Sequence, residues 1–584
     1  MSPQDTATYT YDGSMLTSVS GTGGNAAHLY YDYDNNFRLS SQELWVQNPN
    51  AQDYDVQMYY GYDQDGLLSS VEFDSPCYRR HVMNISRDPA TGRVTQTNFM
   101  FQPDDQSGLT TSQNYDTLGA CSYYEADFNG SSIFQTSYER DSLGRITILT
   151  EVNQGVMTVK KYSYDILGRL SQVWRNDTLI STYSYDPNGN RIARTTPISS
   201  DSGRYDAQDR MSNYGNAQYI YSRNGELQKK IVGADTTSYM YDYFGNLMSV
   251  QLSNGDLIEY MIDGQNRRIG KKINGAIVKR WIYSGQLTPI AELDSSGNVT
   301  AQFMGNFMSK NCAIYQFITD QLGSVRMVVN VYTGEIVQQI DYDEFGNVLS
   351  DSNPDFQPFA YAGGLYDTQT KLVRFGARDY DASVGRWNRK EPVGFIASNN
   401  IYAYSDNNPI NLIDKNGLWP TKGWLPVHQR AIARVLDENL SPEDIRILQD
   451  QQVTIDEDES LEGSYKHAMK APGQPEWYAR LLAENFVRNE IKAAQDCESA
   501  GGNSNHVKAM QHLGNAIHTM QDATSPSHKG FQTWYGASLW EWPSALDHVL
   551  GELYDPGPGS DLDIATRTAW AYYSGIIPIP GRIF

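Results

Sequence analysis

The sequence lacks the features that mark membrane-spanning and disulfide-rich proteins. It contains no uninterrupted apolar stretch of about 18 residues, so no membrane-spanning helix is expected. Its first residues, MSPQDTATYTYDG, lack a basic end followed by an apolar run, so no signal peptide is expected. The four cysteines (Cys77, Cys121, Cys312 and Cys497) are scattered without a CxxC pair, which is the pattern of neither a disulfide framework nor a thiolate zinc site.

Positive charge and histidine are also scarce. Lysine and arginine number 46 against 69 acidic residues, which gives a formal net charge of −23. Simple electrostatics makes such a chain a poor binder of nucleic acid or anionic membranes. The length of 584 residues predicts more than one domain and a large core.

The composition changes sharply near residue 418. Of the 41 tyrosines, 35 lie before this point, together with two of the nine histidines. The remaining six tyrosines and seven histidines lie after it. We therefore expect two unlike parts.

A short unit recurs through the first part. Clear copies are YDQDGLLSSV (62–71), YDILGRLSQV (164–173), YDPNGNRIAR (185–194), YDYFGNLMSV (241–250) and YDEFGNVLSD (342–351), with looser copies starting at Tyr11, Tyr33 and Tyr115. Alternating aromatic and polar residues lead into a DxxG[NR] turn, where Gly or Asn supplies the positive φ. The repeat predicts antiparallel β-hairpins through most of 1–360.

These units resemble the YD repeats of the Rhs family and of the C component of insecticidal Tc toxins, over roughly residues 5–418. The resemblance implies an all-β hollow shell of hairpins (1–360) that encloses a C-terminal toxic domain. The alternative is a surface-exposed adhesive repeat protein.

Residues 361–418 resemble the Rhs core signature, in YAGGLYDTQTKLVRFGARDYDASVGRWNRKEPVGF and NIYAYSDNNPINLIDKNGLWP. The resemblance implies self-cleavage between Leu418 and Trp419 by an aspartic-protease-like pair, at positions matched by Glu391 and Asp414. Two carboxylates held close cannot both ionise, so one can act as acid while the other activates water. Arg386 could orient or stabilise the site. Two positions depart from the family pattern: Glu391 stands where Asp is usual, and Lys415 stands where Pro is usual. The alternative to self-cleavage is that this segment is a structural plug that carries out no chemistry.

Residues 419–584 show apolar residues at helical spacing and predict an all-α domain. His518 and Asp522 are four residues apart and share one helix face, as do His548 and Glu552, and His528 follows a Ser-Pro break. One such pair is often a surface ion pair. Two pairs plus another histidine indicate a metal site, and imidazole with carboxylate suits zinc.

This layout resembles the zinc-dependent phospholipase C family and the related single-strand nucleases, firmly at 512–552. The resemblance implies three zinc ions, with His428, His467 and Asp456 as earlier ligands; Asp458 and Asp450 are alternatives to Asp456. The final Glu552 favours the phospholipase branch. His512 lies off that helix face and is expected to be structural, and His506 has no assigned role.

The family's remaining ligand is the amino group and carbonyl oxygen of an N-terminal Trp. Cleavage after Leu418 would make Trp419 the first residue of the toxin domain. An α-amino group has a pKa near about 8, so its metal-binding free base is accessible at neutral pH. Self-cleavage would therefore complete the metal site, unless Trp419 merely sits where the family's cut falls.

The resemblance implies hydrolysis of a phosphodiester by zinc-activated water, which Asp456 could help to orient. A membrane phospholipid is the favoured substrate; nucleic acid is the alternative in the same metal chemistry. A second alternative is a delivery or adhesion protein whose C-terminal part only binds a partner.

The resemblance also implies a polymorphic toxin, secreted or injected from a bacterium into target cells. It implies a cognate immunity protein. Shells of that family are usually longer, so residues 1–418 are expected to be either a fragment or a shell completed by a second chain, which could also aid secretion. No N-terminal PAAR-like adaptor of type VI secretion is present, so the route stays open.

Overall fold

A computed structural model shows the chain as two compact units, residues 1–88 with 92–423, and residues 89–91 with 424–584. We call them the shell unit and the C-terminal unit. The predicted domain boundaries at 360 and 418 stay predictions. The structure describes residues 6–12, 15–22, 27–35, 38–46, 54–64, 66–75, 78–89, 92–100, 108–116, 120–283, 287, 289–392, 400–417, 432, 435–436, 440–441, 444–445, 447–448, 451–452, 455, 462–471, 474–523, 561–575, 578–579 and 583.

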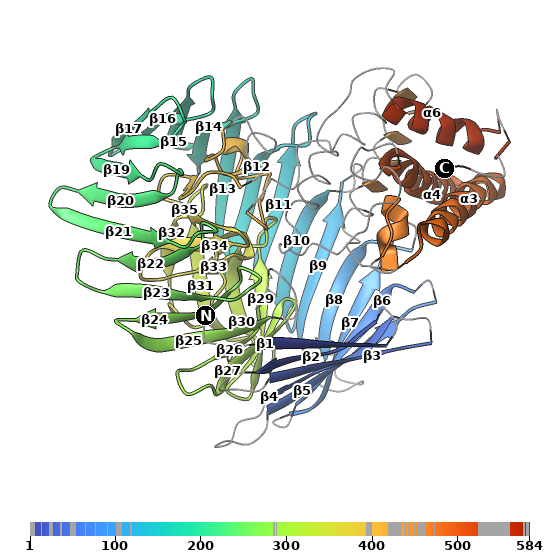
Figure 1. Ribbon diagram of the computed structural model, residues 1–584, viewed down its shortest axis with the longest axis horizontal. Coiled ribbons are helices and arrows are strands. Elements are labelled where there is room, and N and C mark those ends of the chain that lie inside the picture. Colours follow the sequence, from blue (N-terminus) through green and yellow to red (C-terminus); the bar gives the residue numbers. More distant parts are fainter. Residues whose placement is uncertain are drawn as a thin grey trace. The chain divides into compact units, whose positions relative to one another are not determined.

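The shell unit contains one antiparallel sheet in which each strand pairs with the next along the chain (Figure 1). Its strands are β1 (Thr6–Asp12), β2 (Met15–Thr22), β3 (Ala27–Tyr33), β4 (Leu39–Val46), β5 (Tyr54–Tyr62), β6 (Leu68–Ser75), β7 (Tyr78–Arg87), β8 (Val94–Met100), β9 (Leu109–Tyr115), β10 (Cys121–Phe128), β11 (Ser131–Arg140), β12 (Ile146–Asn153), β13 (Val156–Tyr164), β14 (Leu170–Arg175), β15 (Thr178–Tyr185), β16 (Arg191–Thr195), β17 (Ser200–Tyr205), β18 (Met211–Tyr214), β19 (Ala217–Tyr221), β20 (Leu227–Val232), β21 (Asp235–Tyr241), β22 (Leu247–Gln251), β23 (Leu257–Ile262), β24 (Arg268–Ile273), β25 (Ala276–Tyr283), β26 (Pro289–Leu293), β27 (Val299–Met304), β28 (Phe307–Lys310), β29 (Ala313–Thr319), β30 (Val325–Asn330), β31 (Ile336–Tyr342) and β32 (Val348–Asp351). The predicted hairpin array is confirmed.

The aspartate of each YD unit closes its turn. In YDILGR, Asp165 Oδ1 accepts hydrogen bonds from the amides of Leu167 and Arg169 at 3.0 and 2.9 Å. Its Oδ2 accepts from Nε of Arg169 at 2.7 Å. Gly168 has a φ of +81°, which a side chain would strain. The need for an acceptor at the first position, a positive φ at the fourth and a donor at the fifth explains the DxxG[NR] pattern.

In several units the tyrosine joins the unit to the preceding hairpin. The hydroxyl of Tyr164 donates to the carbonyl of Ile146 at 2.6 Å, and that of Tyr185 donates to Leu170 at 2.7 Å. The guanidinium of Arg169 lies 4.8 Å from the ring centre of Tyr185. These neighbouring repeats are therefore tied by a part-buried hydrogen bond and a cation–π contact.

The late part of the shell unit packs against its early part. One buried cluster combines Phe73 and Phe99 of β6 and β8 with Phe307 and Met327 of β28 and β30. A smaller sheet follows, with strands β33 (Leu365–Tyr366), β34 (Leu372–Phe375), β35 (Arg378–Asp381) and β36 (Arg386–Trp387), and with the 3-10 helices η1 (Tyr361–Gly363) and η3 (Ser405–Asn407) beside it. Tyr380 and Trp387 of this sheet, and Tyr404 before η3, share a second cluster with residues of β25 and β27–β31. Most described residues of 359–392 and 400–414 are thus buried, and we call these two stretches the core element.

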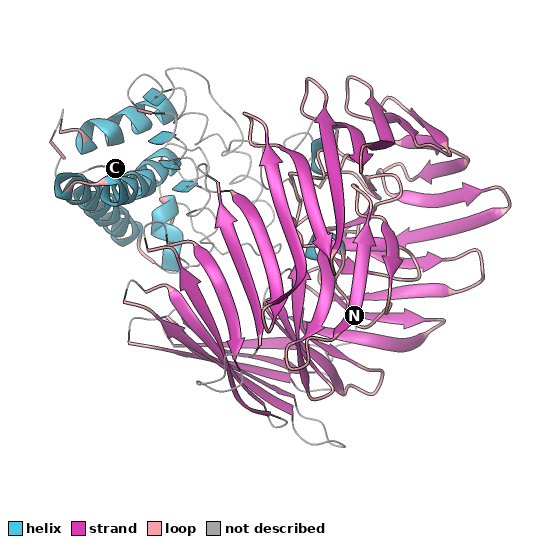
Figure 2. Ribbon diagram, turned by 180° about the vertical axis from the view of Figure 1, so that it is seen from behind, coloured by secondary structure: helices cyan, strands magenta, loops and turns pink. Residues whose placement is uncertain are grey.

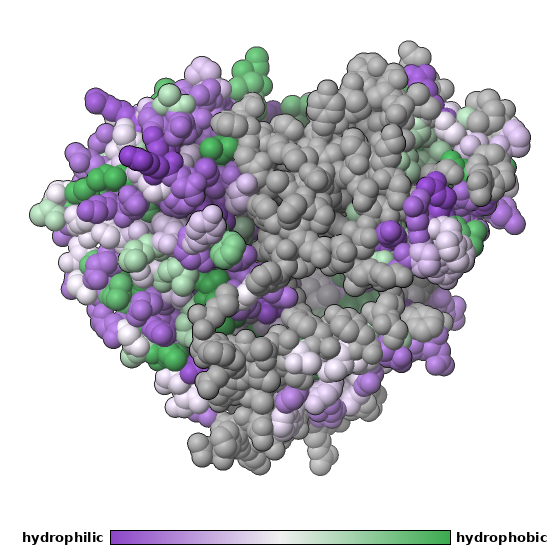
Figure 3. Space-filling model, viewed as in Figure 1, coloured by the Kyte–Doolittle hydropathy of each residue, from purple (hydrophilic) through white to green (hydrophobic). Residues whose placement is uncertain are grey.

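The surface of the described strands is mostly polar, with scattered apolar residues (Figure 3). Cys312 is disulfide-bonded, which the sequence did not predict, and Cys121 and Cys497 are free thiols. Among the described residues, no helix is both long enough and apolar enough to cross a membrane.

The described elements of the C-terminal unit are helices, whereas the strands all belong to the shell unit (Figure 2). They are η4 (Glu462–His467), α3 (Glu476–Ala500), α4 (Asn503–Asp522) and α6 (Asp561–Tyr573). Val487 and Ile491 of α3 pack on Leu513 and Ile517 of α4 and on Ala569 of α6. The chain is therefore mostly β-structure, with a few helices near its C-terminus.

His506 links three helical segments through both ring nitrogens. Nε2 lies 2.8 Å from Asp444 Oδ1, and Nδ1 lies 2.8 Å from Glu498 Oε2. Both hydrogen bonds require the protonated ring, because neutral imidazole carries only one N–H. The bond to Glu498, helped by that to Asp444, outweighs burial and raises the pKa of His506.

This raised pKa predicts a pH dependence for the C-terminal unit. The stabilisation is complete below the unfolded pKa of about 6.5 and is lost as the pH rises through the higher folded value. We expect the melting temperature of this unit, followed by calorimetry of the full chain, to fall between about pH 6 and pH 9. The fall should shrink in His506→Gln and persist in His512→Gln, which removes another surface His–Glu pair. An unchanged fall in His506→Gln contradicts this assignment.

Candidate metal centre and candidate self-cleavage site

Three of the predicted metal ligands lie together in the C-terminal unit. His518 and Asp522 stand on the last turn of α4, and His467 ends η4. Nε2 of His518 lies 3.1 Å from Nδ1 of His467 and 3.1 Å from Oδ2 of Asp522. Nδ1 of His467 lies 3.2 Å from the same carboxylate oxygen. Within the described part of the chain, this is the one group of three or more such side chains that could hold a metal ion.

The three residues are deeply buried. His518 and Asp522 are 0% exposed and His467 is 9% exposed. A carboxylate without access to water needs a compensating positive charge. Two imidazole nitrogens and one carboxylate oxygen at mutual distances near 3 Å form a donor set that fits a tetrahedral zinc ion.

Gln452 fixes which nitrogen of His518 faces the cluster. The side-chain amide of Gln452 donates to the carbonyls of Gly514 and Leu448 at 2.9 and 3.2 Å. Its oxygen therefore faces Nδ1 of His518, at 3.1 Å. Since an amide oxygen only accepts, Nδ1 carries the proton and Nε2 keeps its lone pair for a metal. The sequence did not indicate this contact.

Gly514 permits this close approach. A Cβ atom there would lie 2.8 Å from Cβ of Gln451, the residue beside Gln452.

Hydrogen-bonded partners of a ligating histidine commonly change metal affinity by about 10- to 100-fold. Gln452→Leu is therefore expected to weaken zinc binding by about 10- to 100-fold, because His518 loses the acceptor that sets its tautomer. Gln452→Glu keeps an acceptor for Nδ1 of His518 but loses the donors to the carbonyls of Gly514 and Leu448, so it should bind zinc more tightly than Gln452→Leu. Competition with a chromophoric chelator measures both. Equal affinity in Gln452→Leu and the wild type would refute the orienting role.

The other predicted ligands, Trp419, His428, Asp456, His528, His548 and Glu552, lie outside the described residues, as does the scissile residue Leu418. His512 does not join the cluster: its Nδ1 lies 2.8 Å from Glu490 of α3.

The predicted carboxylate pair of the shell unit converges on one arginine. Nη2 of Arg378 forms a 2.9 Å ion pair with Asp414 and a closer one with Glu391. All three side chains are at most 3% exposed. Nε of Arg378 donates to the carbonyl of Gly417, the last described residue before Leu418. The pair therefore stands beside the chain that leads into the predicted cleavage site.

Arg378, rather than Arg386, occupies the position between the carboxylates. Arg386 instead donates to Asn190 and to the carbonyl of Asp209, at 2.9 and 2.6 Å, and to Asn400 at 3.5 Å. Arg378 also stacks 4.1 Å from the ring centre of Trp387. The sequence signal that could have identified Arg378 is the arginine of the RDYD motif (378–381) in the core signature.

The hairpin array, the buried core element and the helical C-terminal unit define a YD-repeat shell protein. A family model described as the Teneurin YD-shell matches residues 2–410. The chain belongs to this family.

Curated relatives include Teneurin-3 of Danio rerio, 27% identical over 419 residues that cover 66% of this chain and 14% of the relative. Teneurin-4 of Mus musculus is 28% identical over 414 residues, with the same coverages. The tRNA nuclease WapA of Bacillus subtilis (strain 168) is 27% identical over 285 residues, 45% of this chain and 12% of the relative. The chain thus spans 14% of the length of these teneurins.

Similar solved structures include a Photorhabdus luminescens Tc holotoxin pore with a mutation in TccC3. It is 16% identical, with a TM-score of 0.48, over 71% of this chain and 21% of that one. The TcdB2-TccC3 structure is 14% identical, with a TM-score of 0.45, over 71% of this chain and 27% of that one.

Proposed function

We propose that the chain is a YD-shell toxin whose C-terminal unit is a zinc-dependent phosphodiesterase of the phospholipase C type. The observation that carries the proposal is the convergence of His467, His518 and Asp522 within 3.2 Å of one another. Zinc held in such a site acts as a Lewis acid on a phosphodiester and lowers the pKa of water.

The residues of this chain supply the binding and orientation. His518 presents a lone pair fixed by Gln452, and Asp522 supplies a buried negative charge. The hydroxyl of Thr519 donates to the carbonyl of Lys466 at 2.6 Å, which holds η4, and with it His467, against α4. The further ligands proposed from the sequence are His428, Asp456, His528, His548 and Glu552.

We propose that self-cleavage between Leu418 and Trp419 frees this unit. Glu391 and Asp414 act as the acid–base pair, and Arg378 binds both carboxylates and the carbonyl that precedes Leu418. A new amino group at Trp419 would then complete the metal site, so the uncut chain would have weak activity.

The proposed biological setting is a toxin that leaves a bacterium and enters target cells. It would require an immunity protein in the producer and a partner chain for shell closure or secretion. A phospholipid is the proposed substrate, because Glu552 matches the phospholipase branch of the resemblance and the acidic chain disfavours polyanionic nucleic acid.

The test is hydrolysis of mixed phospholipid vesicles by the purified, zinc-loaded chain, with and without a chelator. We expect phosphorylated head groups to be released, the release to stop on chelation and to return when zinc is added. Zinc-independent release, or none, would contradict the phospholipase assignment.

A nuclease is the second candidate, favoured by the relative named as a tRNA nuclease. The same preparation is therefore offered tRNA and single-stranded DNA. Chelator-sensitive cleavage of these, with intact vesicles, would assign the metal site to nuclease chemistry. A chain that binds no zinc would support the partner-binding alternative.

A further inference from the structure

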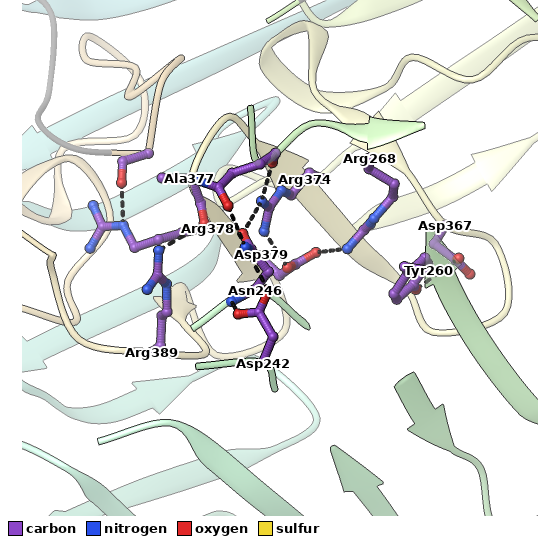
Figure 4. A network of polar contacts seen from close by, with 12 residues as sticks. Asp242, Asn246, Tyr260, Arg268, Asp367, Arg374, Ala377, Arg378, Asp379 and Arg389 are labelled. Carbon is purple, nitrogen blue, oxygen red and sulfur yellow. Dashed lines mark hydrogen bonds and ion pairs between the residues drawn. The ribbon is translucent and has the colours of Figure 1, made fainter. Parts of the chain in front are cut away.

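Strand β35, which carries Arg378, also contacts the YD repeats through the residues around Arg378 (Figure 4). Arg378 begins β35, and the next residue, Asp379, forms two buried ion pairs. Its Oδ1 pairs with Arg268 of β24 at 2.7 Å, and its Oδ2 pairs with Arg374 of β34 at 2.9 Å. Arg268, Arg374 and Asp379 are all under 5% exposed.

Arg374 and Arg389 extend these contacts to two neighbouring repeat turns. Nη2 of Arg374 donates to Asn246 Oδ1 at 3.1 Å and to the carbonyl of Asn266 at 3.2 Å. Asn246 also donates to Asn266 Oδ1 at 2.8 Å, which joins the two turns. Arg389 donates to the carbonyls of Phe244 and Ala377, at 3.0 and 3.1 Å. One guanidinium thus spans a repeat turn and the residue before Arg378.

Positive charge is concentrated at this junction. Burial, and then the nearby charges of Arg374 and Arg378, lower the pKa of Arg389 to about 10, so its guanidinium stays protonated at neutral pH. The nearby carboxylates Asp379, Glu391 and Asp414 compensate these cations. Such a network is stable only when its members are in place together, because a buried charge that loses its partner is strongly unfavourable.

We propose that the repeat turns 242–246 and 263–267 position Arg378 for self-cleavage, with Arg268, Arg374, Asp379 and Arg389 as the positioning residues. The site then forms only after these repeats have folded around the core element, so the chain is cut only after this part of the shell is built. This inference rests on the proposed self-cleavage. Displacements of about 1 Å are enough to slow a reaction by about 100-fold, which makes the cut sensitive to these contacts.

The test is the rate of self-cleavage of the full chain made by cell-free translation, followed by mass spectrometry under denaturing conditions. Arg389→Gln removes both carbonyl contacts, and Arg268→Gln removes one partner of Asp379. Each should slow the cut by about 10- to 100-fold. Arg389→Lys keeps the charge and N–H donors and should recover part of the rate. Arg169→Gln is the matched control, because Arg169 pairs with Asp165 in a repeat turn that is not one of the two proposed positioning turns.

The melting temperature of the shell unit separates positioning from general damage. The inference predicts slow cutting in Arg389→Gln at a melting temperature close to that of Arg169→Gln, which should cut at the wild-type rate. Wild-type rates in Arg389→Gln and Arg268→Gln would overturn it. If Arg389→Gln does not fold, Arg389→Lys decides: a rate below wild type supports the inference, and an equal rate overturns it. A wild-type chain that stays uncut would instead refute self-cleavage itself.

Discussion

Asp522→Asn is expected to lose zinc from the C-terminal unit and with it all chelator-sensitive phosphodiesterase activity. The asparagine keeps the size of the side chain but removes the charge that faces His467 and His518. Since changes to a residue that merely orients a ligand cost about 10- to 100-fold in affinity, loss of a ligand should cost more than about 100-fold. Metal analysis after dialysis and vesicle hydrolysis measure the two effects.

His512→Gln is the matched control, because His512 lies on the same helix and pairs with Glu490 away from the cluster. It should retain zinc and activity. The metal-free forms of both variants should show the helical signal of the wild type in circular dichroism. Full zinc content in Asp522→Asn would remove this residue from the metal site.

Asp414→Asn is expected to leave the chain uncut, at an intact mass near 65.8 kDa, whereas the wild type separates into two fragments. Loss of a catalytic acid or base typically slows a reaction by about 10²- to 10⁴-fold. The asparagine can still accept a hydrogen bond from Arg378, so the core element should stay folded. Because Trp419 then has no free amino group, the uncut chain should also bind less zinc and hydrolyse vesicles more slowly than the wild type.

Asp355→Asn serves as the control for this variant. Asp355 is an exposed carboxylate of the shell unit that accepts a hydrogen bond from Thr368 at 3.0 Å. This variant should be cut as in the wild type. If Asp414→Asn and Asp355→Asn are cut at equal rates, the carboxylate pair has no part in cleavage. If Asp414→Asn stays uncut but binds zinc and acts as the wild type does, only the role of Trp419 is refuted.

The hairpin array could be predicted because the hydrogen bonds and the positive φ of each DxxG[NR] turn are supplied by residues adjacent in sequence. Asp165, Gly168 and Arg169 satisfy one another within five residues, so the sequence displays the turn directly. The contacts between repeats were not predicted. The hydrogen bond from Tyr164 to Ile146 depends on the register between neighbouring hairpins, and a repeat pattern does not specify that register.

The metal cluster shows the same division between local and distant contacts. His518 and Asp522 could be paired from their spacing on one helix, and His467 followed from the family resemblance. Gln452 could not be foreseen, since its position depends on the space that Gly514 leaves between two segments. Arg386 was proposed for the cleavage site and Arg378 was not, although both belong to the same sequence signature. Only the fold shows which guanidinium meets the carboxylates.

The central claim is that the C-terminal unit holds zinc through His467, His518 and Asp522. Crystals of the zinc-loaded protein, measured on both sides of the zinc absorption edge, test it most directly. The account predicts an anomalous peak about 2.0–2.2 Å from Nδ1 of His467, Nε2 of His518 and Oδ2 of Asp522. A zinc-loaded crystal without a peak there, with the three side chains still hydrogen-bonded to one another, would contradict it.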